Sequence, residues 1–172
     1  MDPHVIAAFR SACATCVSAG PHVIDWRGSP FEPLRSMANR RKSAVGVRTV
    51  RELILRRFKI LLHSSVSPAA ALAYGAMIVK VKTCIQWENG NVVYEQIRSD
   101  EPYDLLVMAA FCPDDFLLWA VPRKVVLAQS LPQHAEHSRW VRFEPESPPG
   151  WLRPFGGAHR RGLRVLGEAL GL

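Results

Sequence analysis

The chain has 172 residues, 48% of them hydrophobic, and a net charge of +7. This length and apolar content suit one folded domain with its own core and exclude wholesale disorder. The longest apolar stretch, residues 68–79, is too short for a membrane span and contains Pro68 and Gly75. Its first four residues lack the basic start of a secretory signal, so we expect a soluble cytoplasmic protein.

The first predicted helix covers residues 5–17, which are largely apolar. It contains a CxxC motif, and thiolate and imidazole groups nearby could form a tetrahedral zinc site. The candidate ligands are Cys13, Cys16, His4 and His22. Small apolar residues on a packed helix face are the simpler interpretation, with the thiols reduced. Glycine and proline then predict a loop over residues 20–33, followed by a basic connector over residues 35–43.

Residues 44–62 have a helical period, with an apolar stripe formed by Val47, Val50, Ile54, Phe58 and Leu61. Between residues 35 and 59 there are nine basic residues and one acid, Glu52, so this segment alone carries a charge of +8. Glu52 lies four residues from Arg48 and Arg56, which predicts helix-surface salt bridges, or alternatively a metal-binding acid. The localised charge favours binding to a phosphate backbone, although a solvated basic face is a simpler possibility.

Strands follow. Residues 69–82 predict one or two strands, the last of which places Lys80 and Lys82 on one face because strand side chains alternate. Asn89-Gly90 between apolar runs predicts a hairpin. Residues 103–111 and 116–121 are almost continuously apolar, as in strands that are covered on both faces.

After Pro122 the pattern predicts a short helix to about residue 130, an edge strand over 139–143 and a basic helix over 158–170. The order of elements indicates an α/β fold with a central mixed β-sheet flanked by helices. We divide the chain into an N-terminal helix with a basic connector, residues 1–42, and an α/β domain, residues 43–172.

Several short motifs occur in a fixed order within this α/β region. They are the strand Ile78-Val79-Lys80-Val81-Lys82-Thr83, the element Gln96-Ile97-Arg98, the strand start Tyr103-Asp104, the segment Trp119-Ala120-Val121-Pro122-Arg123, and a late strand around Trp140. Over about residues 43–156 this combination resembles small bacterial restriction-endonuclease-like proteins of the PD-(D/E)XK nuclease superfamily. The resemblance implies a restriction-endonuclease-like fold, DNA as the partner, Mg²⁺ as the cofactor of catalytic members, and a role in bacterial defence.

The signature carries over only in part. Lys82 stands at the motif lysine, but Lys80 occupies the place of the carboxylate or glutamine. No acid lies between His63 and Lys80, where the preceding aspartate of the family belongs. Two lysines without a carboxylate repel Mg²⁺ and attract phosphate. We therefore expect a DNA-binding protein that is degenerate in metal catalysis and needs no cofactor.

An active endonuclease with a relocated acid is the alternative. Its catalytic residues would be Lys82, Glu95, Gln96 and Asp104, with Glu95 or Asp104 as the displaced Mg²⁺ ligand and Lys82 as the electrophile. The simpler interpretation of these acids is that they are loop and turn residues.

In either case we expect duplex DNA to be held by basic side chains. The candidates are Arg40, Arg41, Lys42, Arg48, Arg51, Lys80, Arg98, Arg160 and Arg161. A third possibility is a non-catalytic protein-interaction subunit, in which the basic segment meets an acidic partner. A homodimer or a partner subunit is compatible with each of these hypotheses.

Overall fold

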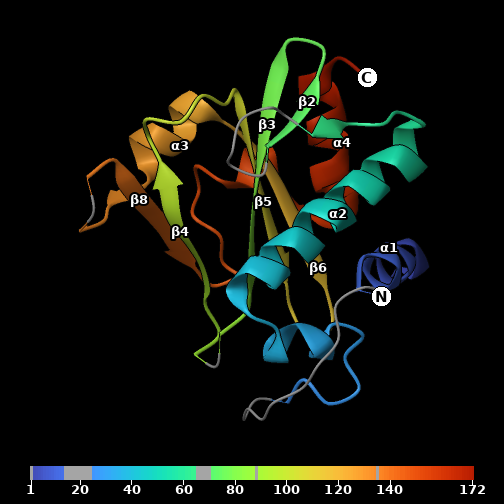
Figure 1. Cartoon of the computed structure of the whole chain (residues 1–172). Coiled ribbons are helices and arrows are strands. Elements are labelled where there is room, and N and C mark those ends of the chain that lie inside the picture. The colour runs from blue at the N-terminus through green and yellow to red at the C-terminus, as the bar shows by residue number, and fades with distance from the viewer. Residues whose placement is uncertain (1, 14–24, 65–70, 88, 135) are drawn as a thin grey trace.

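The computed structural model describes residues 2–13, 25–64, 71–87, 89–134 and 136–172 (Figure 1). Its central sheet has six strands in the order β1-β2-β3-β5-β6-β9. The bounds are β1 His63–Ser64, β2 Ala71–Tyr74, β3 Met77–Ile85, β5 Leu105–Phe111, β6 Phe116–Pro122 and β9 Gly156–Ala158. β3 and β5 are parallel and the other neighbours are antiparallel, so the sheet is mixed, as predicted.

A second, three-stranded sheet covers one face of the central sheet. It consists of β4 (Val92–Arg98), β8 (Ser138–Phe143) and β7 (Leu131–Pro132), in the order β4-β8-β7. The helix α3 (Arg123–Gln129) lies on the same side (Figure 1). The prediction of a sheet flanked by helices therefore holds mainly for the opposite face, where the longer helices lie.

Those longer helices are α1 (Pro3–Cys13), α2 (Asn39–Phe58) and α4 (His159–Leu170), and Figure 1 shows them on the side away from β4 and β8. Short 3₁₀ helices, η1 (Glu32–Ser36) and η2 (Arg153–Phe155), complete the helical segments of the described residues. None of the helices in the described part of the chain is long and apolar enough to cross a membrane.

The alternation of side chains along the central strands creates two hydrophobic cores. Val107, Ala109 and Phe111 of β5 face the helices, whereas Leu106, Met108 and Ala110 face the second sheet. All seven residues of β5 are buried, which confirms the prediction of a strand covered on both faces. In β3, Val79 and Val81 enter the helix-side core, so Lys80 and Lys82 share the opposite face, as predicted.

The helix α2 begins at Asn39, not at residue 44 as predicted, so part of the expected basic connector is helical. The predicted boundary between residues 42 and 43 lies inside this helix. It ends at Phe58 because Lys59 adopts a left-handed conformation, with φ of 60°, and its amide bonds to the Leu55 carbonyl. Leu61, which was expected on the apolar stripe, therefore lies beyond the helix and is 46% exposed.

Two predictions of strand pairing were wrong. The turn at Asn89-Gly90 forms, with Gly90 at φ of 81°, but β3 and β4 do not pair as a hairpin. β4 instead pairs with β8 in the second sheet, because its buried residues Val92, Tyr94 and Ile97 fill the core there. Because β8 pairs with β4 on one side and with β7 on the other, it is the central strand of its sheet and not an edge strand as predicted.

The N-terminal helix is tied to the C-terminal helix through Asp2. Its carboxylate accepts hydrogen bonds from the His4 amide, at 2.7 Å, and from Arg160 Nε, at 2.8 Å, and lies 3.2 Å from His159 Nε2. Burial would raise the pKa of Asp2, but these hydrogen bonds outweigh it and lower the pKa to about 2. Of the four proposed zinc ligands, His4 is exposed and Cys13 is the last residue of α1, whereas Cys16 and His22 lie outside the described residues, as do the last four residues of the predicted first helix.

Candidate functional site

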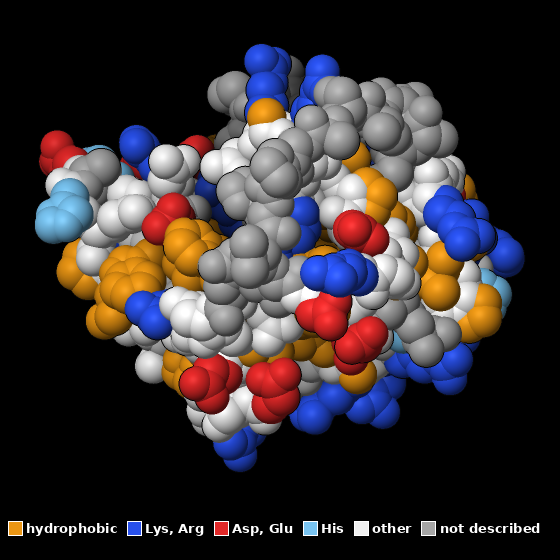
Figure 2. Space-filling model, turned by 90° about the horizontal axis from the view of Figure 1, so that it is seen from below, with side chains coloured by type: hydrophobic (Ala, Val, Ile, Leu, Met, Phe, Trp, Pro, Cys, Tyr) orange, Lys and Arg blue, Asp and Glu red, His pale blue; other side chains and the backbone are white. Residues whose placement is uncertain are grey.

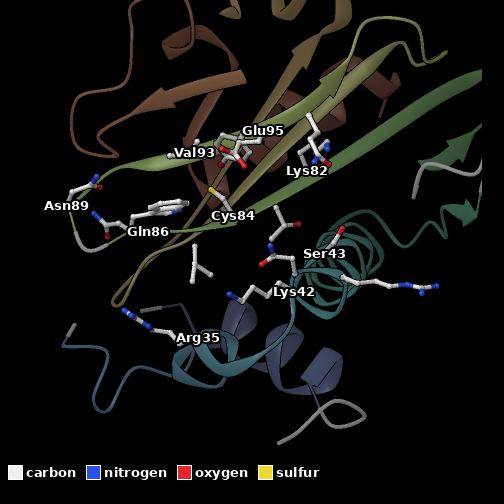
Figure 3. A pocket seen from close by; sticks show the side chains of 16 residues that line it. Arg35, Lys42, Ser43, Lys82, Cys84, Gln86, Asn89, Val93 and Glu95 are labelled. Carbon is white, nitrogen blue, oxygen red and sulfur yellow. The ribbon is translucent and has the colours of Figure 1, made fainter. Parts of the chain in front are cut away.

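A cavity of about 810 Å³ lies where the start of α2, the second half of β3 and β4 come together. Its described lining contains four basic side chains and one carboxylate, namely Arg35, Arg40, Lys42 and Lys82, with Glu95. Three of the four residues predicted to be catalytic (Lys82, Glu95 and Gln96) therefore lie in one cavity. Figure 3 shows Lys82 and Glu95 on one side of it and Arg35 and Lys42 on the other.

Lys82 reaches the cavity because of its place in β3. Its neighbour Val81 is buried in the helix-side core, so the alternation of the strand directs Lys82 to the face of the second sheet. Burial lowers the pKa of Lys82, and the charge of Glu95 partly offsets this effect. The Lys82 ammonium is thus a partly desolvated cation that an additional anion would stabilise.

The opposite wall comes from η1 and the first turn of α2. Leu34 and Met37 are buried and fix the chain just before the helix, and Arg35 and Lys42 lie close enough for their charges to interact. The pKa of Lys42 is lowered by burial and by the positive charge of Arg35. The helix end also contributes the positive end of its dipole, which favours anions.

Glu95 and Gln96 are placed by a β-bulge in β4. The pairing of β4 with β8 shifts in register between Tyr94 and Ile97, so that two consecutive residues are exposed. Gln96 adopts a φ of 53°, and its amide donates to Gln133 Oε1 at 3.1 Å. Such bulges redirect side chains at the rims of sheets, and this one directs Glu95 toward Lys82.

Asp104, the fourth predicted catalytic residue, does not lie in this cavity. Its carboxylate accepts a hydrogen bond from the Ile78 amide at 2.8 Å and so holds the start of β3 against β5. Lys82 is paired with Met108, four residues beyond Asp104, so the backbone positions of Asp104 and Lys82 are roughly 13 Å apart along the sheet. A metal ion bound by Asp104 would therefore lie outside the cavity that Lys82 and Glu95 line.

The described lining of the cavity does not suit a magnesium ion held by the protein. Mg²⁺ requires oxygen ligands in octahedral geometry, and proteins supply them chiefly as carboxylates. Here Glu95 is the only carboxylate among the described lining residues, and it faces four basic groups. No cluster of three or more His, Cys, Asp or Glu side chains suited to a metal occurs in the described part of the chain.

Lys80 does not line the cavity. It is 4% exposed, its ammonium contacts Glu101, and it lies 5.7 Å from the centre of the Tyr103 ring. Burial, followed by the charges of Lys82 and Arg98, lowers the pKa of Lys80 to about 8. The ammonium of Lys80 is therefore held by Glu101 and Tyr103, in the segment that leads into β5, and it does not reach a ligand in this arrangement.

Burial of Lys80 makes the stability depend on pH. The folded-state pKa lies below the unfolded value of 10.5, so between about pH 8 and 10.5 the unfolded chain binds more protons. We expect the free energy of unfolding of the wild type to rise with pH across this window. The rise should be about 1–3 kcal/mol larger than that of the Lys80→Met variant, which lacks the titrating group. Urea unfolding at several pH values between 7 and 10.5 measures this difference.

The matched control is Lys124→Met, since Lys124 is an exposed lysine of α3. That variant should keep the pH dependence of the wild type. Equal pH slopes for wild type and Lys80→Met would show that Lys80 is not buried as a charged group.

The other predicted DNA-binding residues lie on several parts of the surface. Arg40 lines the cavity, Arg41 and Arg48 are exposed on α2, and Arg51 is half-buried. Glu52 pairs with Arg56 at 3.8 Å, which confirms helix-surface pairing for that acid. Figure 2 shows acidic side chains between the basic ones on the face seen from below, so this face is not uniformly positive.

Three of the remaining basic residues have partners within the protein. Arg98 binds Asp100 through two hydrogen bonds of 2.8 and 2.5 Å. Arg160 binds Asp2, and Arg161 Nη2 donates to the Arg153 carbonyl at 2.8 Å. None of the three lines the cavity, so the start of α2 and Lys82 are the basic groups that the fold brings together.

Several lining residues were not predicted as site residues. They include Asn39, Cys84, Gln86, Trp87, Asn89 and Tyr94. Asn89 was predicted only as part of a turn, and no pattern in the sequence marked Trp87 as a site residue. Burial raises the pKa of the Cys84 thiol to about 12, so this cysteine is not a reactive nucleophile.

The cavity combines cations from η1, α2 and β3 with polar side chains of β4 and the adjoining turn. This arrangement can hold a polyanion, and the described residues form no group of three or more metal ligands. Comparison of the chain with models of known protein families and with curated proteins found no match.

Proposed function

We propose that this protein binds nucleic acid at the cavity through the phosphate backbone and does not hydrolyse it. The observation that carries the proposal is the meeting of Arg35, Arg40, Lys42 and Lys82, from three separate segments, around Glu95, the one carboxylate of the described lining. Two of these side chains, Lys42 and Lys82, have pKa values lowered by burial, so bound phosphate would relieve an electrostatic cost that the folded protein carries.

We further propose that the chain is a degenerate relative of the PD-(D/E)XK nucleases. In support, Lys82 projects from a central strand that runs parallel to β5, and it lies beside the Gln96-Ile97-Arg98 element. The positions that would hold the metal carry Lys80, which is buried, and no acid. DNA is the nucleic acid that this relationship favours, with bacterial defence as the setting.

The competing function is that of an Mg²⁺-dependent endonuclease, and one observation favours it. Glu95 lies close enough to Lys82 to act on its pKa, as a carboxylate and a lysine of a nuclease would. Asp104 does not join this pair, and four basic groups surround the one acid. We therefore favour nucleic-acid binding without cleavage over the endonuclease.

The test is the salt dependence of binding, measured by fluorescence anisotropy with labelled oligonucleotides. We expect dissociation constants of about 1–100 µM near physiological salt, tightening steeply as the salt concentration falls. Lys42→Gln and Lys82→Gln should each weaken binding and lower the slope of log K against log salt by about 1. Lys124→Gln removes the same charge from an exposed site on α3 and should change neither quantity by as much.

Incubation of the protein with plasmid and Mg²⁺ or Mn²⁺ separates the competing functions. We expect no cleavage. Cleavage that is lost in Lys82→Ala would establish the endonuclease instead. The absence of binding to any oligonucleotide at low salt would refute nucleic-acid binding and favour an acidic protein partner for the basic segment.

A further inference from the structure

Trp87 is exposed at the cavity. Four large hydrophobic side chains in the described part of the chain are substantially exposed, and Trp87, at 53%, is the aromatic one among them. It also lines the cavity, together with the basic residues. By contrast, Trp26 and Trp119 are 2% and 0% exposed and belong to the cores. The fold thus leaves one large aromatic surface in water next to a cluster of cations.

The main chain holds Trp87 in place. Its amide donates to the Asn91 carbonyl at 2.8 Å, and its carbonyl accepts from the Gly90 amide at 2.9 Å. The side chain of Gln86 donates to the Gly90 carbonyl at 2.9 Å and fastens the same turn. The ring is therefore carried by a hydrogen-bonded turn and is not required to fill a core.

We infer that the cavity receives a single-stranded nucleic-acid segment, with a base stacked on Trp87 and its phosphates on the Lys42 and Lys82 side. This inference rests on the proposed function. In an undistorted duplex the faces of the bases are covered by their neighbours, so an exposed aromatic side chain can stack without a cost of unstacking on an unpaired base. Cationic grooves combined with aromatic side chains are the usual means of binding single strands without sequence preference.

The size of the cavity agrees with this ligand. A volume of about 810 Å³ lies within the range of about 300–1,000 Å³ of sites that enclose small molecules. Such a cavity can enclose a nucleotide or a short unpaired stretch, whereas a duplex would have to lie across its opening. The duplex expected from the sequence would touch the cations but leave the ring of Trp87 without a stacking partner.

The test compares four probes of equal length by anisotropy at low salt: oligo(dT), oligo(rU), an abasic DNA strand and a DNA duplex. We expect the two base-bearing single strands, or one of them, to bind about 5- to 100-fold more tightly than the abasic strand. Trp87→Ala should remove this advantage and leave the affinity for the abasic strand unchanged. Trp87→Phe should retain most of it, because a phenyl ring still stacks.

Leu131→Ala is the matched control, since it removes another exposed hydrophobic side chain, 57% exposed, that does not line the cavity. Equal affinity for base-bearing and abasic strands, or a duplex preferred over both, would overturn stacking on Trp87 while nucleic-acid binding stands. Failure of every probe to bind would refute the proposed function itself. If Trp87→Ala weakens the binding of oligo(dT) more than that of oligo(rU), the ligand is DNA, and the opposite result identifies it as RNA.

Discussion

Replacing Gly162 by alanine is expected to lower the free energy of unfolding by about 3–5 kcal/mol, a large part of the total that stabilises a typical domain. Gly162 lies in α4 where the helix touches β6. A Cβ atom at this position would lie 2.1 Å from the Leu118 carbonyl oxygen and 2.7 Å from its carbon. Those atoms belong to the backbone of a central strand, so they cannot move without disturbing the sheet. Urea unfolding followed by circular dichroism measures the loss.

Gly167 in the same helix provides the matched control. Its added Cβ would meet the ring of Phe58 at 2.6 Å, and the partly buried Phe58 ring is the end of a side chain that can rotate. Gly167→Ala should therefore cost no more than about 1–2 kcal/mol, and the gain in helix propensity offsets part of that. Similar losses at the two positions would contradict a backbone contact between α4 and β6.

The second large effect is expected at Gly46, where α2 crosses β3. A Cβ here would lie 1.9 Å from Thr83 Oγ1 and 2.6 Å from Thr83 Cβ. Helix propensity alone would make Gly46→Ala stabilising by about 1 kcal/mol. We instead expect a loss of about 2–3 kcal/mol from overpacking. Because α2 carries Lys42, its displacement should also weaken oligonucleotide binding.

A compensating substitution tests the cause. Thr83→Gly removes all three atoms that the new methyl group meets. The double variant Gly46→Ala/Thr83→Gly should therefore lose less stability than the sum of the losses measured for the two single variants. The double variant should be close to the wild type in stability, because glycine within a strand costs about 1 kcal/mol and alanine within the helix regains about as much. Additive losses in this double-mutant cycle would mean that the two residues are not in contact.

The helices and strands were predicted from patterns among neighbouring residues, whereas their positions in the fold depend on pairing between residues far apart in the sequence. The helical period of α2 and the apolar runs of β5 and β6 are set by neighbouring residues, so each was predicted. The placement of β4 was not, because Asn89-Gly90 favours a hairpin locally while Val92, Tyr94 and Ile97 gain more by covering the second core. That competition depends on β8, some fifty residues further along the chain.

The same distinction applies to the site. Lys82, Glu95 and Gln96 were chosen from short motifs, and the fold brings all three to one cavity. Asp104 was chosen on the same grounds, but it holds the opposite end of β3. The burial of Lys80 and the exposure of Trp87 depend on how the two sheets close, and sequence neighbours carry no information about that.

The two walls of the cavity belong to different cores, which has a consequence for how such a protein changes over evolution. The Lys42 wall is anchored by buried residues of α2 in the helix-side core, and the Glu95 wall by β4 in the core between the sheets. Substitutions on one wall therefore leave the packing of the other intact, and their effects on affinity should be nearly independent. A lineage built on this architecture can exchange one ligand for another by altering a single wall while its fold persists.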